Sequence, residues 1–330
     1  MFIRGAILEV VKHHSQESRF FREVCMDIKE KNQKALACLA SQNWERAQRL
    51  FFANAKQYPC HETYNNLGVF LIHEGLTCQN GKSRSAKKLG MKYLLRAADM
   101  KTTPVNLCAI AKAFDFKSRN MDKAEKEQLF RKMYQLLVTA YRIVPTNETQ
   151  YNILRLRILT KEYNTTLLEE TKNLLTAFEC EESVRLYFET LRLFSVFDEG
   201  VCCIDQYGRY LAEDDILLFY AKHEKYDYGY RLCKTVFSQY SLNKYIAAAI
   251  IECCANTNHA EEACFYAQHV VAIKDKVHAH KADWIELVVS NPDRSEVYRK
   301  KLISEYLSIP PFVDSCCYFG CREHNCIEVD

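Results

Sequence analysis

The sequence repeats a short helical pattern, and this repeat restricts the possible folds more than any other feature. In "NWERAQRLFFANAKQYP", Ala47 is followed by Phe51 four residues later and by Pro59 twelve residues later. The segment "MYQLLVTAYRIVP" has the same apolar spacing between Met133 and Pro145. Side chains four and seven residues apart lie on one face of a helix. The repeated spacing therefore predicts a series of helices that use equivalent faces for packing.

Seven positions can start this pattern, and they are separated by 43, 43, 33, 34, 29 and 34 residues. Small residues are common among them, because two closely crossing helices leave no room for a large side chain at the contact. A regular spacing of this size is typical of stacked helix pairs, none of which can bury its apolar face alone. The seven positions are Ala47, Gly90, Met133, Thr166, Gly200, Gly229 and Ala263.

The composition agrees with a helical protein. Only 9 Gly and 6 Pro occur in 330 residues, against an average near 12% for the two together, which disfavours turn-rich β architecture. The apolar fraction of 48% is sufficient for a packed core, and a net charge of +3 disfavours nucleic acid as the main partner. A basic stretch, "CQNGKSRSAKKLGMK", leaves a local anion or nucleic-acid contact open beside the simpler interpretation as a solvated loop.

The chain is expected to be a cytoplasmic protein without a membrane span. Its start, "MFIRGAILEVVKHHSQ", has too short an apolar run for a signal peptide, and "YIAAAII" is far below the ~20 residues that cross a bilayer. The 16 cysteines are then expected to be reduced thiols, because a chain of this length can build its core without disulfides.

A second repeated motif is expected at the connection between one helix pair and the next. "PCHETYNNLGVF" returns in altered form as "PTNETQYNIL", each with a proline before a new helix. Together these motifs resemble the tetratricopeptide repeat, and "YLLRAAD" is similar to the end of its Sel1-like relative. The resemblance covers roughly residues 35 to 290. The resemblance rests on Tyr64, Leu67 and Gly68 in the first helix of a pair. In the second helix it rests on Ala47, Phe51 and Pro59.

This resemblance implies an all-α, right-handed α-solenoid of about seven helix pairs with helical caps. The expected organisation has four parts. Residues 1–40 form an N-terminal helical cap, 41–290 form the repeat array, 291–311 form a C-terminal capping helix and 312–330 form a cysteine-rich tail.

Three asparagines are the candidate binding residues. In repeats of this class, polar residues of the first helices face a concave groove and hold an extended peptide, and Asn66, Asn106 and Asn152 occupy comparable places in the first three such helices. An amide side chain can donate to and accept from a peptide backbone whatever the sequence of the ligand. Arg155 and Lys112 could add positive charge. The alternative is that the asparagines cap or brace neighbouring helices.

The tail carries the only candidate metal ligands that the sequence suggests. Cys317, Cys321, His324 and Cys326 are chemically acceptable for tetrahedral zinc, but their spacing matches no standard zinc module. The expectation is therefore no metal and no cofactor. The remaining interpretations are a disordered thiol-rich end, or docking of Tyr318 and Phe319 on the last helix.

The sequence indicates a non-enzymatic scaffold that binds a protein or peptide ligand. It has no HExxH, no G-x-S-x-G and no phosphate-binding glycine loop. One alternative is a regulatory sensor in which a peptide changes the activity of a partner protein. Another is an enzyme whose active site is assembled from several helices, which would need a deep pocket with converging histidines and carboxylates.

Overall fold

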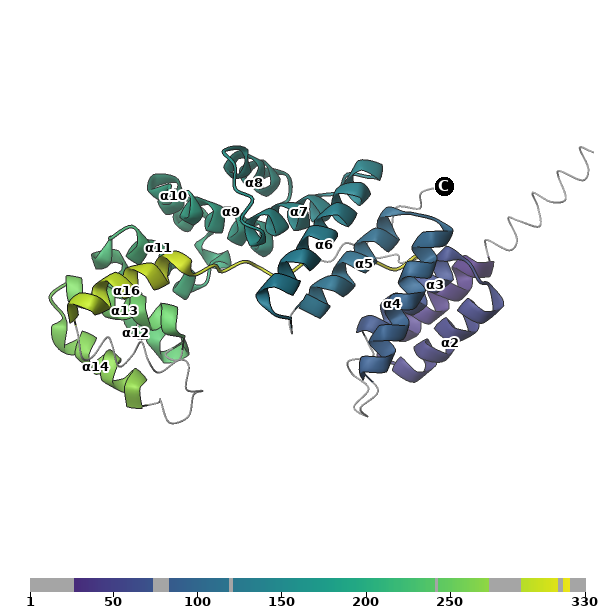
Figure 1. Ribbon diagram of the computed structural model, residues 1–330, viewed down its shortest axis with the longest axis horizontal. Coiled ribbons are helices and arrows are strands. Elements are labelled where there is room, and N and C mark those ends of the chain that lie inside the picture. Colours follow the sequence, from purple (N-terminus) through teal and green to yellow (C-terminus); the bar gives the residue numbers. More distant parts are fainter. Residues whose placement is uncertain are drawn as a thin grey trace, which may run out of the picture. The chain divides into compact units, whose positions relative to one another are not determined.

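The protein is described from a computed structural model that covers residues 27–73, 83–118, 121–240, 243–272, 292–313 and 317–320. Throughout these ranges the only regular secondary structure is helical, so the all-α prediction is confirmed (Figure 1). Residues 27–40 are helical and precede α2. No helix in the described ranges is both long and apolar enough to pass through a membrane.

The helices have the following bounds: α2 Trp44–Gln57, α3 His61–His73, α4 Ser83–Met100, α5 Pro104–Ser118, α6 Lys123–Ile143, α7 Asn147–Leu159, α8 Thr166–Ala177, α9 Glu181–Leu193, α10 Phe197–Tyr207, the 3-10 helix η2 Gly208–Tyr210, α11 Glu213–Lys222, α12 Tyr226–Tyr240, α13 Lys244–Asn256, α14 Ala260–Ala272 and α16 Pro292–Glu305.

The chain forms two compact units, and the first of them combines stretches from early and late in the sequence. Unit 1 runs from the N-terminus to Glu162 and also includes the chain from Phe312 onward, while unit 2 spans Tyr163–Pro311. In unit 1, α3 packs on α4, α5 on α6 and α6 on α7. In unit 2 the pairs include α8 with α9, α11 with α12, and α13 with both α14 and α16. Packing between consecutive helices thus dominates each unit.

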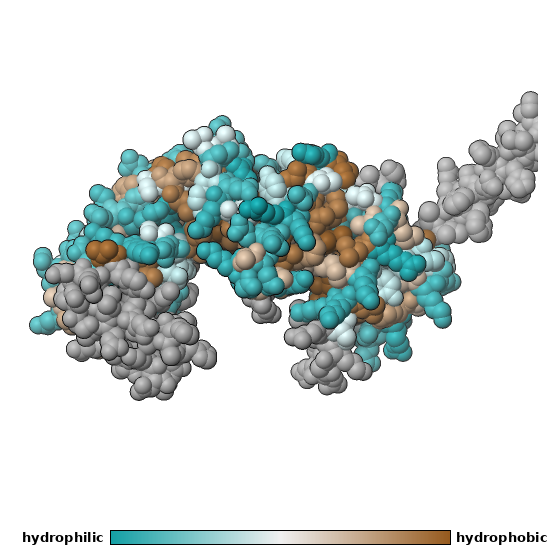
Figure 2. Space-filling model, in the orientation of Figure 1, coloured by the Kyte–Doolittle hydropathy of each residue, from teal (hydrophilic) through white to brown (hydrophobic). Residues whose placement is uncertain are grey.

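The repeated spacing marks buried faces of α6 and α12. In α6, Met133, Leu137 and Ala140 are all fully buried. In α12, Cys233 and Val236 are buried in the same way, four and seven residues after Gly229. Hydrophilic residues cover much of the described surface in Figure 2, with hydrophobic patches between them. The apolar spacing therefore did identify faces that pack inside the units.

One predicted anchor was wrong by a single residue. Thr166 is the exposed first residue of α8, whereas Leu167, Thr171 and Leu174 carry the spacing and are buried. The Thr171 hydroxyl donates to the Leu167 carbonyl oxygen at 3.0 Å. Because this bond stays within the helix, a polar residue can occupy a buried position that the sequence pattern reserved for an apolar one.

Helices α3 and α4 approach each other through two glycines. A Cβ atom added to Gly90 would lie 2.8 Å from the carbonyl oxygen of Gly68, and one added to Gly68 would lie 2.9 Å from the carbonyl oxygen of Gly90. Backbone atoms cannot move aside as a flexible side chain can. Both glycines are therefore required by the close crossing of these two helices, as the small-residue anchor predicted.

We expect Gly90→Ala to lower the free energy of unfolding by about 1–3 kcal/mol, because the new methyl group would collide with backbone and separate α3 from α4. This loss should appear even though alanine favours helix more than glycine does. The measurement is urea unfolding followed by circular dichroism. Gly208→Ala is the matched control, since no heavy atom lies within 4 Å of its added Cβ. Equal stability of the two variants would contradict the packing role of Gly90.

Candidate functional site

Asn152 of α7 pairs with the backbone of Val313, a residue from the far end of the chain. Its side-chain Nδ2 donates to the Val313 carbonyl oxygen at 2.8 Å, and the Val313 N–H donates to Oδ1 at 3.0 Å. The same Nδ2 also donates to the Glu148 carbonyl oxygen one turn earlier, at 2.9 Å. Asn152 is fully buried. Nδ2 thus has one partner within α7 and one in the segment, whereas Oδ1 accepts from the Val313 N–H.

Asn66 of α3 makes the same paired contact with Phe319. Nδ2 donates to the Phe319 carbonyl oxygen at 2.9 Å, and the Phe319 N–H donates to Oδ1 at 2.8 Å. The adjacent Asn65 donates to the Cys317 carbonyl oxygen at 2.6 Å. Both asparagines are completely buried.

We name the surface that contacts Phe312, Val313 and residues 317–319 the C-terminal groove, and define it by Phe51, His61, Asn65, Asn66 and Asn152. Asn66 and Asn152 are each the sixth residue of their helix, which explains why both can reach the backbone in the same manner. The sixth residue of α5 is Ala109, so that helix offers no equivalent amide.

Asn106 does not belong to this pair, and its predicted equivalence with Asn66 and Asn152 was wrong. It is the third residue of α5, where its Oδ1 accepts from the Thr103 N–H at 2.9 Å and its Nδ2 donates to the Lys101 carbonyl oxygen at 2.5 Å. Its side chain therefore closes the start of a helix, the alternative role that the sequence left open.

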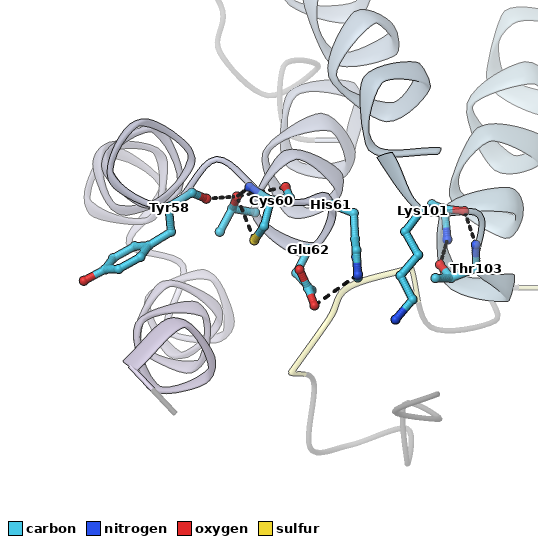
Figure 3. Close-up of polar contacts among 8 residues, drawn as sticks. Tyr58, Cys60, His61, Glu62, Lys101 and Thr103 are labelled. Carbon is cyan, nitrogen blue, oxygen red and sulfur yellow. Dashed lines mark hydrogen bonds and ion pairs between the residues drawn. The ribbon is translucent and has the colours of Figure 1, made fainter. Parts of the chain in front are cut away.

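The true counterparts of Asn106 are Thr63 in α3 and Ser183 in α9. The Thr63 hydroxyl accepts from the Cys60 N–H at 3.3 Å and donates to the Tyr58 carbonyl oxygen at 2.5 Å (Figure 3). Ser183 makes the same two bonds at the start of α9. A hydroxyl and an amide thus perform the same capping function, and this equivalence cannot be seen by aligning asparagines.

Aromatic and apolar contacts complete the C-terminal groove. The Tyr318 ring stacks on Phe51 of α2 with centroids 6.0 Å apart, and the Phe319 ring lies 5.3 Å from the ring of His61. Cys317 is buried in an apolar cluster, against which Phe312 also packs. The prediction that Tyr318 and Phe319 dock on the last helix was therefore wrong, because they dock on α2 and α3 of unit 1.

The two basic residues predicted beside the asparagines have other contacts. Arg155 is largely buried, and its Nη1 donates to Asp115 Oδ1 at 3.1 Å. The Lys112 ammonium lies 6.0 Å from the centre of the Phe116 ring. Neither contact involves the C-terminal segment, so charge from these residues at a ligand stays a prediction.

His61, at the start of α3, is the titratable side chain beside Phe319. Its Nε2 lies 3.3 Å from Glu62 Oε1, and Lys101 is its other charged neighbour (Figure 3). Burial is the largest influence and holds the pKa of His61 below its usual value, with Lys101 acting in the same direction and Glu62 opposing it. His61 and Asn65 were not predicted from the sequence, although both lie within the motif "PCHETYNNLGVF".

Buried charged groups of unit 2 contact Tyr306 and Ser308, which precede the segment bound in unit 1. Arg192 of α9 forms a bidentate pair with Glu189 at 3.0 and 2.7 Å and donates to the Tyr306 carbonyl oxygen. Asp215 of α11 accepts a hydrogen bond from the Ser308 side chain. Side chains of α9 and α11 therefore contact the chain just after α16 in this unit.

The candidate zinc ligands, for which no metal was expected, are only partly within the described residues. The thiol of Cys317 belongs to a buried apolar cluster, while Cys321, His324 and Cys326 lie outside the described residues. Where the structure describes the chain, no group of three or more metal-ligating side chains comes together. The basic stretch begins outside the described ranges and continues into α4, where Lys88 is exposed.

No protein-family model matches the sequence, and no curated protein is significantly similar to it. The functional interpretation therefore depends on the contacts of the site.

Replacing Asn152 by alanine should remove Oδ1, which accepts the hydrogen bond from the Val313 N–H. A buried N–H without an acceptor costs about 1–3 kcal/mol, so hydrogen exchange at Val313 should accelerate about 5- to 150-fold. Asn66→Ala should have the same effect at Phe319. Residue-resolved amide exchange by NMR is the measurement.

Asn106→Ala is the matched control for this experiment. It should accelerate exchange at Thr103, whose N–H Asn106 accepts, and leave Val313 and Phe319 unchanged. Unchanged exchange at Val313 and Phe319 in the Asn152 and Asn66 variants would contradict the observed pairing.

Asp215 should make the stability of unit 2 depend on pH. Burial raises the pKa of Asp215 from 3.8 to about 6, Asp214 and Glu189 act in the same direction, and Ser308 and Arg185 oppose it. The folded state therefore binds this proton more tightly than the unfolded state, so stability is lost as pH rises from about 4 through 6.

Asp215→Asn cannot ionise and should be free of this loss. Between pH 4.5 and 7.5 its free energy of unfolding, relative to the natural chain, should rise by about 2 kcal/mol. Urea unfolding at several pH values measures the difference. Parallel pH profiles of the two proteins would show that Asp215 does not titrate in this range.

Proposed function

We propose that the chain is a non-enzymatic scaffold that binds an extended segment of a protein or peptide in the C-terminal groove. The observation that carries the proposal is a pair of asparagines, each of which bonds both the N–H and the carbonyl oxygen of one residue. Asn152 makes these bonds with Val313, and Asn66 makes them with Phe319. Such contacts recognise an extended backbone, whereas the side chains of the bound segment decide which sequence fits.

The proposal includes a right-handed, tetratricopeptide-like solenoid of about seven helix pairs. It is supported by the packing of consecutive helices within each unit and by the recurring buried face of the second helices. The repeated capping of first helices by Thr63, Asn106 and Ser183 also favours a common building block. We propose the cytoplasm as its location, in line with the expectation of reduced cysteines.

A peptide-responsive regulatory sensor is the second candidate, and one observation favours it. The segment bound in unit 1 follows directly after residues 306–308, which contact α9 and α11 in unit 2. A ligand that replaced the segment in unit 1 would release a length of chain whose other end is held in unit 2. Binding in one unit could then be communicated along the chain to the other.

The scaffold function can be tested with random peptides displayed on phage and selected on the full-length protein. We expect enriched peptides to bind the natural chain and to lose at least tenfold in affinity to the Asn66→Ala, Asn152→Ala double variant. This loss would follow from the removal of paired contacts to the peptide backbone. Fluorescence anisotropy of synthetic peptides provides the affinities.

The control is Asn106→Ala, which removes a buried amide outside the C-terminal groove and should leave peptide affinity unchanged. Circular dichroism of all three proteins establishes that they are folded. Failure to enrich any peptide, or equal affinity for the double variant, would reject peptide binding by this groove.

A further inference from the structure

We propose that the C-terminal segment that carries Phe312, Val313 and residues 317–319 is a tethered competitor, and that the partner of the C-terminal groove is a non-helical segment of another protein with the same pattern of anchors. This inference rests on the proposed function and adds the chemistry of the ligand to it. The pattern is an aromatic residue, then a small apolar residue five positions later, followed at once by two aromatic residues.

The backbone contacts define the conformation of the partner. Asn152 and Asn66 each need an N–H and a C=O from a single residue, and Asn65 donates to a further carbonyl oxygen. A helix uses these same groups within itself, so a helical ligand could not supply them. The groove therefore requires a chain that is not helical at these positions, and in the natural segment Phe319 lies in a turn.

The side-chain contacts define the sequence of the partner. The position of Cys317 is buried among apolar residues and accepts a small side chain. The position of Tyr318 stacks on Phe51, and the position of Phe319 faces His61, so both require an aromatic ring. Phe312 supplies the first apolar anchor.

Three features of the segment favour exchange with a partner. Its described residues form neither helix nor strand. Side-chain amides bind its backbone at Val313, Cys317 and Phe319, and such contacts are equally available to another sequence. Phe312, Val313, Tyr318 and Phe319 are only partly buried. The amides that hold the segment are fully buried when it is bound, so an exchange must replace its backbone groups by those of another chain or by water.

A tethered segment competes at an effective concentration of about 1 mM for a short flexible connection. If the segment itself binds the groove with an intrinsic dissociation constant of about 10 μM, a peptide ligand would bind the natural chain about 100-fold more weakly than an open groove. The segment thereby restricts binding to partners that fit better than it does or that are locally concentrated.

The test uses full-length protein and a fluorescein-labelled synthetic peptide with the sequence of residues 310–320, under reducing conditions. Val313→Pro with Phe319→Pro removes both N–H donors from the tethered segment and leaves every groove residue intact. We expect the peptide to bind this double variant at least tenfold more tightly than the natural chain. Adding Asn66→Ala and Asn152→Ala to the variant should abolish the gain.

Each other outcome overturns the inference in a different way. Equal affinity for the natural chain and the proline variant would reject the tethered competitor and leave peptide binding by the groove intact. No binding to either protein, while phage-selected peptides do bind, would reject this anchor pattern alone. A concentration-dependent dimer of the natural chain that excess peptide dissociates would assign the groove to the segment of a second copy.

Discussion

The arrangement of unit 1 depends on buried asparagine amides that must find hydrogen-bond partners. Asn66 and Asn152 are fully buried, and an unpaired amide in that environment would be strongly destabilising. In each case a single residue of the C-terminal segment supplies both a donor and an acceptor. These contacts join the chain after Phe312 to helices of the first half of the sequence, and both belong to unit 1.

The helical framework decides where these amides can lie. The close contact of Gly68 with Gly90 fixes α3 against α4, and the capping side chains fix where the first helices begin. An asparagine at the sixth position of such a helix lies beside the segment, whereas one at the third position is used in the cap. The same residue type therefore has two functions that differ by one helical turn.

Local periodicity made much of the fold predictable, but the site was only partly predictable. The spacing of four and seven residues identified buried faces in α6 and α12, and failed by one residue at α8 because Thr171 satisfies its hydroxyl within its own helix. The sequence did predict that the amides of Asn66 and Asn152 bond a peptide backbone. The occupant was not, because the contact between Asn66 and Phe319 spans 253 residues and periodicity carries no information about such distant pairs.

The most direct test of the central claim is a double-mutant cycle between Asn152→Ala and Val313→Pro, with the free energy of unfolding measured by urea denaturation. The first change removes the amide and the second removes the N–H that it accepts. If the two residues are paired, the second change should cost little after the first, and the coupling energy should be about 1 kcal/mol or more. Fully additive losses would mean that Asn152 and Val313 act independently, and would contradict an amide that holds an extended backbone.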